Sequence, residues 1–322
     1  CEFYISDRPE KKQFTKDDPD RRTHIVLLAK NMKGYKNLTK LSSIGYVNGF
    51  YFGVPRISKE MISEYKEDLI ALTAGTLGDI PSTILEFGEQ KGEEVFKWWK
   101  ESFQDDFYVQ IQNHEVEEEE HLNDVLLEFA EKYETKILAQ NETFYTEKSD
   151  AHIQDILYCI KDGEKLSSPV GKGFGKRRGL PTHEFYIKNE DELKQTFRQF
   201  PDAFEAYSEF LAKFEPYTLK RDVLLPEFGI PEEFLSEEDQ LDGGKRGENA
   251  YLRFLTYEGA AKKYPEITDE IKDRLDFELA VIANTGYPGY FLIVQDFCAE
   301  ARNMGVWVGP GRGSAAGSAV AY

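Results

Sequence analysis

The chain has 322 residues, of which 40% are hydrophobic and 14% aromatic, and its formal net charge is −19. This composition is typical of a globular protein rather than a disordered one, and the length allows two domains. No run approaches the roughly 18 apolar residues of a membrane-spanning helix, and the N-terminus lacks a signal-peptide pattern, so no membrane association is expected. Three scattered cysteines, Cys1, Cys159 and Cys298, argue against a disulfide framework and indicate a reducing, cytoplasmic compartment.

The net charge is distributed unevenly along the chain. Residues 245–322 contain 9 basic and 10 acidic side chains, so nearly all of the net charge of −19 lies before residue 245. A strongly acidic surface repels nucleic acid. If the protein handles DNA, the acidic first part of the chain is therefore not the part that grips it.

The first half of the chain alternates between predicted strands and predicted helices. The chain begins at Cys1 in what reads as a strand, and short apolar runs predict further strands at 24–29, 68–73, 107–111 and 136–139. Apolar residues at helical spacing predict helices at 34–47, 79–89, 92–103, 116–133 and 150–160. Strands that alternate with helices of this length form parallel βαβ units, so we expect an α/β barrel or an open doubly wound sheet. In both folds chemistry gathers at the carboxyl ends of the strands.

From about residue 180 the pattern becomes mainly helical. Helices are predicted at 190–199, 202–214, 248–263 and 266–284. The stretch 224–231, with two prolines and a glycine, is typical of an extended connector. We therefore predict two domains, 1–220 and 221–322.

Two charged segments have competing interpretations. The acidic run 117–120 falls in the first turn of a predicted helix, where carboxylates complement the helix dipole, and this interpretation is favoured over a metal site. The basic loop 171–179 is interpreted as a solvated loop in preference to a phosphate contact.

The last residues of the chain carry the clearest sign of chemistry. A short apolar run at 305–308, predicted as a strand, leads into the sequence GPGRGS at 309–314, and a helix-compatible run of small residues follows. Glycines allow close backbone approach, the first amides of a helix point outward unpaired, and Arg312 adds a guanidinium suited to phosphate. The pattern predicts an anion site, with a tight turn for close helix packing as the alternative. It is not a Walker loop, because no Lys-Ser or Lys-Thr follows the glycines, and it does not fit the dinucleotide fingerprint.

Two stretches of the second half resemble one family. The sequences NTGYPGYFLIVQDF at 284–297 and VGPGRGSAAGS at 308–318 resemble the start of the palm in the alpha subunits of bacterial replicative DNA polymerase III. Upstream, CEFY at 1–4, residues 24–31 and 34–38, and DAH at 150–152 resemble the polymerase and histidinol phosphatase (PHP) domain that precedes that palm. The resemblance covers essentially the whole chain. It implies an incomplete PHP-type α/β barrel, then a mostly helical segment leading into the start of a polymerase-beta-like palm.

The resemblance also implies a function. Members of this family add deoxynucleotides to a primer 3′ end under the direction of a template, using Mg²⁺ held by carboxylates. The expected partners are primer–template DNA, deoxynucleoside triphosphates, the sliding clamp, a proofreading exonuclease and the clamp loader. The family's Asp-x-Asp strand is expected after Tyr322 and its first His-x-His strand before Cys1, so this chain alone is expected to be inactive as a polymerase. Asp296 is not expected to substitute, because it lies in a predicted amphipathic helix.

Two sets of site residues follow from the resemblance. The triphosphate of the incoming nucleotide is expected to bind at the glycine-rich segment, through Gly311, Arg312, Gly313, Ser314 and Ser318. Intact PHP domains bind two or three metal ions, and the matching positions for a Zn or Mn ion are Glu2, His24, His114 and Glu142. Phe144 stands where active members carry a histidine, and phenylalanine cannot bind a metal. The PHP metal site is therefore expected to be partly degenerate and mainly structural, and His152 is expected to pack or cap rather than to bind metal.

Two alternatives remain open beside the polymerase. A metal-dependent PHP phosphoesterase would explain the first half, but it has no need for the GPGRGS segment, and Phe144 counts against it. A non-catalytic scaffold that binds replisome partners is compatible with the polymerase hypothesis, because an eroded enzyme domain can persist as a platform.

Overall fold

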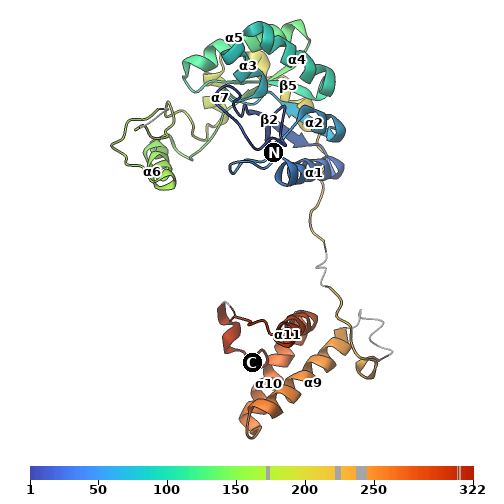
Figure 1. The fold of residues 1–322 in the computed structure, drawn as a ribbon. Coiled ribbons are helices and arrows are strands. Elements are labelled where there is room, and N and C mark those ends of the chain that lie inside the picture. The colour runs from blue at the N-terminus through green and yellow to red at the C-terminus, as the bar shows by residue number, and fades with distance from the viewer. Residues whose placement is uncertain (172–174, 222–225, 237–244, 310, 312) are drawn as a thin grey trace. The chain divides into compact units, whose positions relative to one another are not determined.

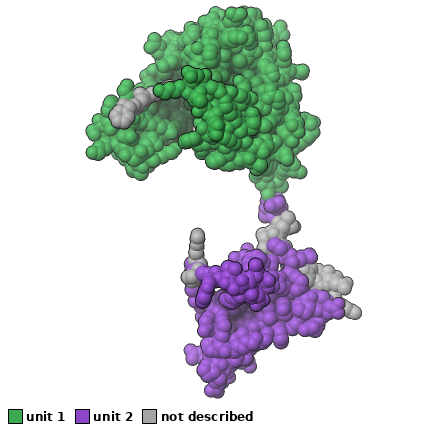
Figure 2. Space-filling view, viewed as in Figure 1, with its two compact units in different colours: residues 1–219 green, residues 220–322 purple. Residues whose placement is uncertain are grey.

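The computed structural model describes residues 1–171, 175–221, 226–236, 245–309, 311 and 313–322. The chain divides into two compact units, Cys1–Leu219 and Lys220–Tyr322, which are coloured separately in Figure 2. Arg312, one of the predicted triphosphate ligands, lies outside the described residues, as does part of the basic loop at 172–174.

Unit 1 is built on a six-stranded sheet with the strand order β3-β1-β2-β4-β5-β6. The strands are β1 (Glu2–Ile5), β2 (Thr23–Ala29), β3 (Arg56–Ile57), β4 (Leu69–Leu72), β5 (Phe107–Gln112) and β6 (Lys136–Gln140). The pairs β1–β3, β4–β5 and β5–β6 are parallel, as the βαβ pattern predicts. The mixed α/β class is thereby confirmed, and among the described residues the sheet is open, with β3 and β6 at its edges.

The all-parallel arrangement expected from the sequence is wrong for one strand. β2 is antiparallel to both of its neighbours, β1 and β4. Residues 6–22 between β1 and β2 form no helix, so nothing forces a parallel crossover and the chain returns antiparallel.

Helices cover both faces of the sheet. In unit 1 they are α1 (Met32–Asn48), α2 (Lys59–Tyr65), α3 (Asp79–Phe87), α4 (Glu89–Phe103), α5 (Glu117–Lys132), α6 (Ala151–Asp162), α7 (Glu190–Thr196) and α8 (Tyr207–Ala212). Short 3₁₀ helices are η1 (Gln104–Asp106), η2 (Lys148–Asp150) and η3 (Pro201–Phe204) in unit 1, and η4 (Glu232–Phe234) and η6 (Gly313–Gly317) in unit 2. Figure 1 shows α3, α4 and α5 lying together over the sheet.

Alternate side chains of β4 pack into two separate cores, one on each face of the sheet. Leu69 and Ala71 join the main core with Trp99 and Phe96 of α4, whereas Ile70 joins a smaller core on the other face that includes Phe210 of α8. Because neighbouring side chains of a strand point to opposite faces, a continuous apolar run such as this one indicates a sheet buried on both sides. This explains why short apolar runs in the sequence located the strands so closely.

The regular elements that the structure describes in unit 2 are all helices, joined by irregular segments. Unit 2 contains α9 (Lys245–Lys263), α10 (Asp269–Thr285) and α11 (Pro288–Asn303), and its core includes Leu252, Leu279, Ile282 and Leu292. The strand predicted at 305–308 does not form, and Trp307 within it is 97% exposed. A strand needs a neighbour to pair its backbone groups, and the described part of unit 2 offers none. None of the helices in the described residues has the length and apolar character needed to cross a membrane.

Candidate functional site

Three of the predicted PHP site residues lie at the end of the sheet where β4, β5 and β6 have their carboxyl ends. β2 runs antiparallel to β4, so His24, near the start of β2, lies beside the carboxyl end of β4. His114 follows the carboxyl end of β5, and Glu142 follows that of β6. The carboxyl ends of these parallel strands meet at the same edge, where open α/β sheets place their functional residues.

Glu2 and His24 form a hydrogen-bonded pair between β1 and β2. Glu2 Oε1 lies 2.5 Å from His24 Nδ1, and the Tyr4 ring meets the imidazole edge-on with 4.4 Å between ring centres. The His24 side chain is 15% exposed, so it is held in place while still reaching the surface. A carboxylate–imidazole pair of this kind can hold a proton, or can orient the imidazole toward a metal.

His114, in contrast, is completely buried, and both of its ring nitrogens are engaged. Nδ1 lies 2.7 Å from Glu119 Oε1, and Nε2 lies 3.0 Å from the backbone nitrogen of Glu142. Nε2 also lies 3.2 Å from the Glu142 carbonyl, but a backbone N–H can only donate, so the shorter contact makes Nε2 the acceptor and assigns the proton to Nδ1, which faces Glu119. These two bonds account for the hydrogen-bonding capacity of a neutral imidazole.

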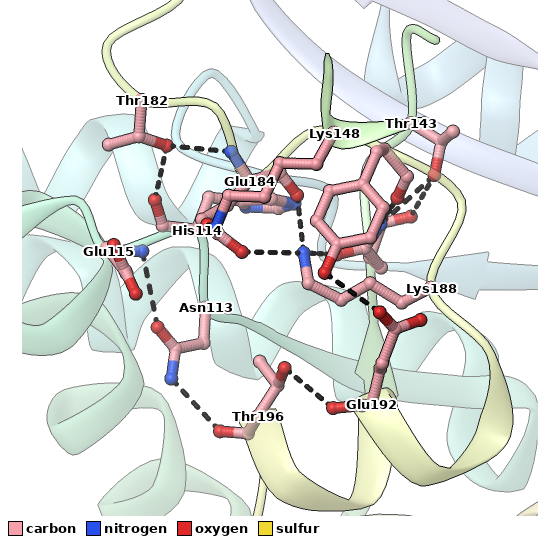
Figure 3. A network of polar contacts seen from close by, with 12 residues as sticks. Asn113, His114, Glu115, Thr143, Lys148, Thr182, Glu184, Lys188, Glu192 and Thr196 are labelled. Atoms are coloured by element: carbon pink, nitrogen blue, oxygen red, sulfur yellow. Dashed lines mark hydrogen bonds and ion pairs between the residues drawn. The ribbon is translucent and has the colours of Figure 1, made fainter. Parts of the chain in front are cut away.

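The segment after residue 180 covers His114 from the other side. The hydroxyl of Thr182 donates to the backbone carbonyl of His114 at 2.6 Å, and the Phe185 ring stacks on the imidazole at 4.3 Å between centres, with 3° between the planes. Figure 3 shows the network continuing from Thr182 through Glu184 to Lys188. His114 thus connects three segments of unit 1 that lie far apart in the sequence.

Glu119, the residue whose carboxylate binds the His114 imidazole, was not identified from the sequence. It lies in the acidic run 117–120, which was assigned to the dipole of the predicted helix, and that run does fall in the first turn of α5. Glu119 alone in the run is buried, at 7% exposed, and its Oε2 also accepts the backbone N–H of His114 at 2.6 Å. The signal that was available is a histidine just after a strand followed by an acid in the first turn of the next helix.

The pKa of Glu142 is affected by the charges of the other predicted PHP site residues. Although Glu142 is exposed as a residue, partial desolvation of its carboxyl raises the pKa of that group above its ordinary value, and the carboxylates of Glu2 and Glu119 raise it further; only a protonated imidazole at His114 or His24 would oppose this shift. Glu142 is therefore within electrostatic reach of the other predicted PHP site residues. We refer to Glu2, His24, His114, Glu119 and Glu142 as the acid–histidine cluster.

Replacing Glu142 by glutamine is expected to stabilise unit 1 only slightly at pH 7, because Glu142 is itself an exposed residue and water screens its carboxylate. The folded-state pKa is raised, so the ionised form is penalised above it, and the penalty fades as the pH falls toward the ordinary value of 4.5. The gain in thermal midpoint should be present at pH 7 and absent near pH ~4. Glu118→Gln, at an exposed position of α5, serves as the control. An equal gain at both pH values would contradict this account.

The acid–histidine cluster does not fit a bound metal ion. Within the described ranges, no three His, Cys, Asp or Glu side chains converge as metal ligands. Both nitrogens of His114 are occupied, and Phe144 packs against Phe185 with 5.8 Å between ring centres. His152 is bonded through Nδ1 to the carbonyl of Ser149 at 2.8 Å, at the start of α6.

Most of the described part of the basic loop is exposed, as the sequence predicts for a solvated loop, but Arg177 within it is buried. Arg177 is 7% exposed, and its Nη2 bonds Asp155 Oδ2 at 2.7 Å while its Nε donates to the Ser168 carbonyl at 2.8 Å. The planar guanidinium matches a carboxylate with two parallel bonds, which favours burial of the pair.

The glycine-rich segment of unit 2 is largely exposed where it is described. Gly311, Gly313 and Ser314 are all exposed, and Gly313 has φ +77°, a left-handed conformation that glycine adopts readily. Gly313 and Ser314 begin the short 3₁₀ helix η6, which ends at Gly317 and stands where an α-helix was expected. The segment therefore presents backbone and hydroxyl groups to solvent, where an anion can reach them.

Ser318, the remaining predicted triphosphate ligand, is bonded inside unit 2. Its hydroxyl donates to Glu278 Oε2 at 2.7 Å and accepts the backbone N–H of Ala321 at 3.1 Å. Burial opposes ionisation of Glu278, yet the bonds from Val320, Ser318 and Arg274 outweigh it and lower the pKa of this carboxyl. The structure thus separates Ser318 from the exposed Gly313 and Ser314.

Two family profiles match different parts of the chain. The PHP domain profile matches residues 1–114, and the profile of the bacterial DNA polymerase III alpha NTPase domain matches residues 250–322. The first match lies in unit 1 and the second in unit 2.

Individual relatives extend the similarity over nearly the whole chain. DNA polymerase III subunit alpha of Borreliella burgdorferi is 38% identical over 300 residues, which is 93% of this chain and 25% of the relative. The corresponding subunit of Treponema pallidum is 32% identical over 100% of this chain and 26% of its own length. That of Aquifex aeolicus is 35% identical over 99% and 27%. The chain therefore spans about a quarter of the length of the curated relatives it matches.

Proposed function

Because this chain belongs to the bacterial DNA polymerase III alpha family, we propose that it is the PHP domain and the start of the palm of a DNA-directed DNA polymerase. The observation that supports this is the order of the two matches, with a PHP domain in unit 1 followed by the polymerase NTPase region in unit 2. The proposed activity of the intact subunit is template-directed addition of deoxynucleotides to a primer 3′ end. It would work in the bacterial cytoplasm with primer–template DNA, a sliding clamp, a clamp loader and a proofreading exonuclease.

Within this chain, the proposed role of the glycine-rich segment is to bind the triphosphate of the incoming nucleotide. Exposed backbone groups around Gly311 and Gly313, the hydroxyl of Ser314 and the guanidinium of Arg312 are the groups offered to the anion. Mg²⁺, when bound to the intact subunit, would neutralise charge on the phosphates. The described residues of unit 2 bring no three acidic side chains together, so we assign no step to Mg²⁺ in this chain.

Nucleotide binding tests this role directly. We expect the chain to bind dATP, and Arg312→Ala to weaken binding about tenfold, because a charge-assisted bond to phosphate is lost. Arg302→Ala, at an exposed position of the last turn of α11, removes the same charge elsewhere and should change affinity little. Titration of a fluorescent dATP analogue at two salt concentrations measures both, and the loss should shrink at high salt. Equal affinity of both variants would overturn the assignment.

For the PHP domain we propose a structural role rather than phosphoester hydrolysis. The observation that favours a structural role is the bonding of His114, because its two ring nitrogens are hydrogen-bonded to Glu119 and to the backbone of Glu142. A hydrolytic metal site needs imidazoles with a free nitrogen, and the acid–histidine cluster does not supply one at this position. The same side chain instead links the end of β5 to α5 through Glu119 and to the segment after residue 180 by stacking on Phe185.

A further inference from the structure

Glu278 on α10 is the buried carboxylate that holds the end of the glycine-rich segment. The residue is 9% exposed, and its neighbours Leu279 and Ile282 belong to the core of unit 2. Its Oε2 accepts two hydrogen bonds from one stretch of chain, from the Ser318 hydroxyl at 2.7 Å and from the Val320 N–H at 3.1 Å. A position on a packed helix makes this a rigid point of attachment.

The other oxygen of Glu278 is used on its own helix. Oε1 accepts from Arg274 Nε at 2.6 Å, one turn earlier on α10. The carboxylate is thus charge-paired on one side and bonded to the segment on the other. A glutamine could not reproduce this, because it has one oxygen and would turn its NH₂ group toward donors on one of the two sides.

The attachment reaches the glycine-rich segment through the backbone. The N–H of Ser318 donates to the carbonyl of Ala315 at 3.1 Å, so the residue bonded to Glu278 also closes a turn onto η6. Val320 packs against the core formed by Leu279 and Ile282. Ser318, Ala319 and Val320 are half-buried, whereas the described residues from 305 to 317 are exposed.

We propose that Glu278 is a positioning residue for nucleotide binding: its bonds to Ser318 and Val320 set where η6 lies, and so aim Gly313 and Ser314 at the triphosphate. This inference rests on the proposed triphosphate role of the glycine-rich segment. It gives Ser318 a different part from the one expected, since its hydroxyl proton is held by Glu278 and is not offered to a phosphate. A preorganised loop binds an anion more tightly because less ordering is required on binding.

Two measurements on the 322-residue chain test this, with Glu278→Gln as the main variant. Native-state amide exchange at Val320 should become about tenfold faster, because its bond to a charged acceptor is lost, and exchange at Ala321 should also rise, because its acceptor, the Ser318 hydroxyl, is no longer held by the carboxylate. Affinity for dATP and for inorganic tripolyphosphate should fall by a factor of about 5 to 10, since a loosened loop must be ordered on binding. Glu258→Gln, at the Glu258–Lys262 surface pair of α9, is the matched control and should change neither.

The outcomes distinguish failure of the positioning role of Glu278 from failure of the proposed nucleotide binding. Unchanged exchange in Glu278→Gln would show that the bonds hold nothing, and faster exchange with unchanged dATP affinity would show that they are structural only; either result overturns the inference. Failure of the wild-type chain to bind dATP or tripolyphosphate would overturn the proposed function, and with it the positioning role, while the exchange data still decide whether Glu278 holds the segment. If Glu278→Gln does not fold, Ser318→Ala removes one of the two bonds and should show both effects at a smaller size.

Discussion

Replacing Arg56 by methionine is expected to destabilise unit 1 by about 3–5 kcal/mol, the range for breaking a buried ion pair. Arg56, in β3, is completely buried and donates from every part of its guanidinium. It bonds Asp20 Oδ1 at 2.7 Å, the Gly49 carbonyl at 3.0 Å, and the carbonyls of Pro9 and Lys11 at 2.7 Å each. Methionine fills similar volume but leaves these acceptors buried without donors.

The Arg56 interactions also hold a long irregular segment in place. Residues 6–22 form neither helix nor strand, and the guanidinium lies 5.4 Å from the ring centre of Phe14 and 5.1 Å from that of Tyr51. One buried side chain therefore organises the connection that lets β2 return antiparallel to β1.

Urea unfolding followed by Trp98 and Trp99 fluorescence measures this effect in unit 1. Arg21→Met is the matched control, because Arg21 pairs with Glu86 at 2.9 Å in a partly exposed site where such pairs contribute only about 0–1 kcal/mol. Arg56→Lys should be intermediate, since an ammonium cannot reach all four acceptors. A loss of less than about 1 kcal/mol in Arg56→Met would mean that water replaces the guanidinium without cost.

Replacing His114 by alanine is expected to cost about 2–4 kcal/mol, whether or not metal ions are present. The change leaves the buried Glu119 carboxylate without its imidazole donor and the Glu142 N–H without its acceptor. It also opens a cavity beside Phe185, where the imidazole was stacked. The loss is therefore structural in origin.

The dependence of the unfolding midpoint on metal ions distinguishes a structural role of His114 from a metal-binding role. The unfolding midpoint of the wild-type chain should be the same with a chelator, with Zn²⁺ and with Mn²⁺, because a ligand that binds only the folded state would raise it. His152→Ala, at the exposed start of α6, controls for the loss of an imidazole. A wild-type midpoint that rises with Zn²⁺, and a rise that disappears in His114→Ala, would instead make His114 a ligand.

The regular elements of unit 1 could be predicted because their periodicity is local. The apolar runs at 24–29, 107–111 and 136–139 correspond to β2, β5 and β6, and the amphipathic stretch 116–133 corresponds to α5. β3 was missed because two residues carry no period. The direction of β2 was missed because pairing depends on the connection between strands and not on the strand itself.

The candidate sites were only partly predictable, for a related reason. A glycine-rich run with an arginine predicts an anion site from residue type alone, and Phe144 can be recognised from its type as a side chain that cannot bind metal. Which histidines keep a free nitrogen depends on partners distant in the sequence. His114 is bonded to the backbone of a residue 28 positions later, and Glu278 to a hydroxyl 40 positions later.

The sequence alone was sufficient to predict the α/β class of unit 1, the mainly helical character of unit 2 and the family, and to locate the glycine-rich segment in the chain. These depend on residue type and on spacing within a few turns of chain. Only the tertiary structure decided that Arg56 is buried, that Glu119 completes the bonding of His114, and that Ser318 is held by Glu278. Each of these is a buried polar group, and such a group is stable only when a complementary partner is brought to it by the fold.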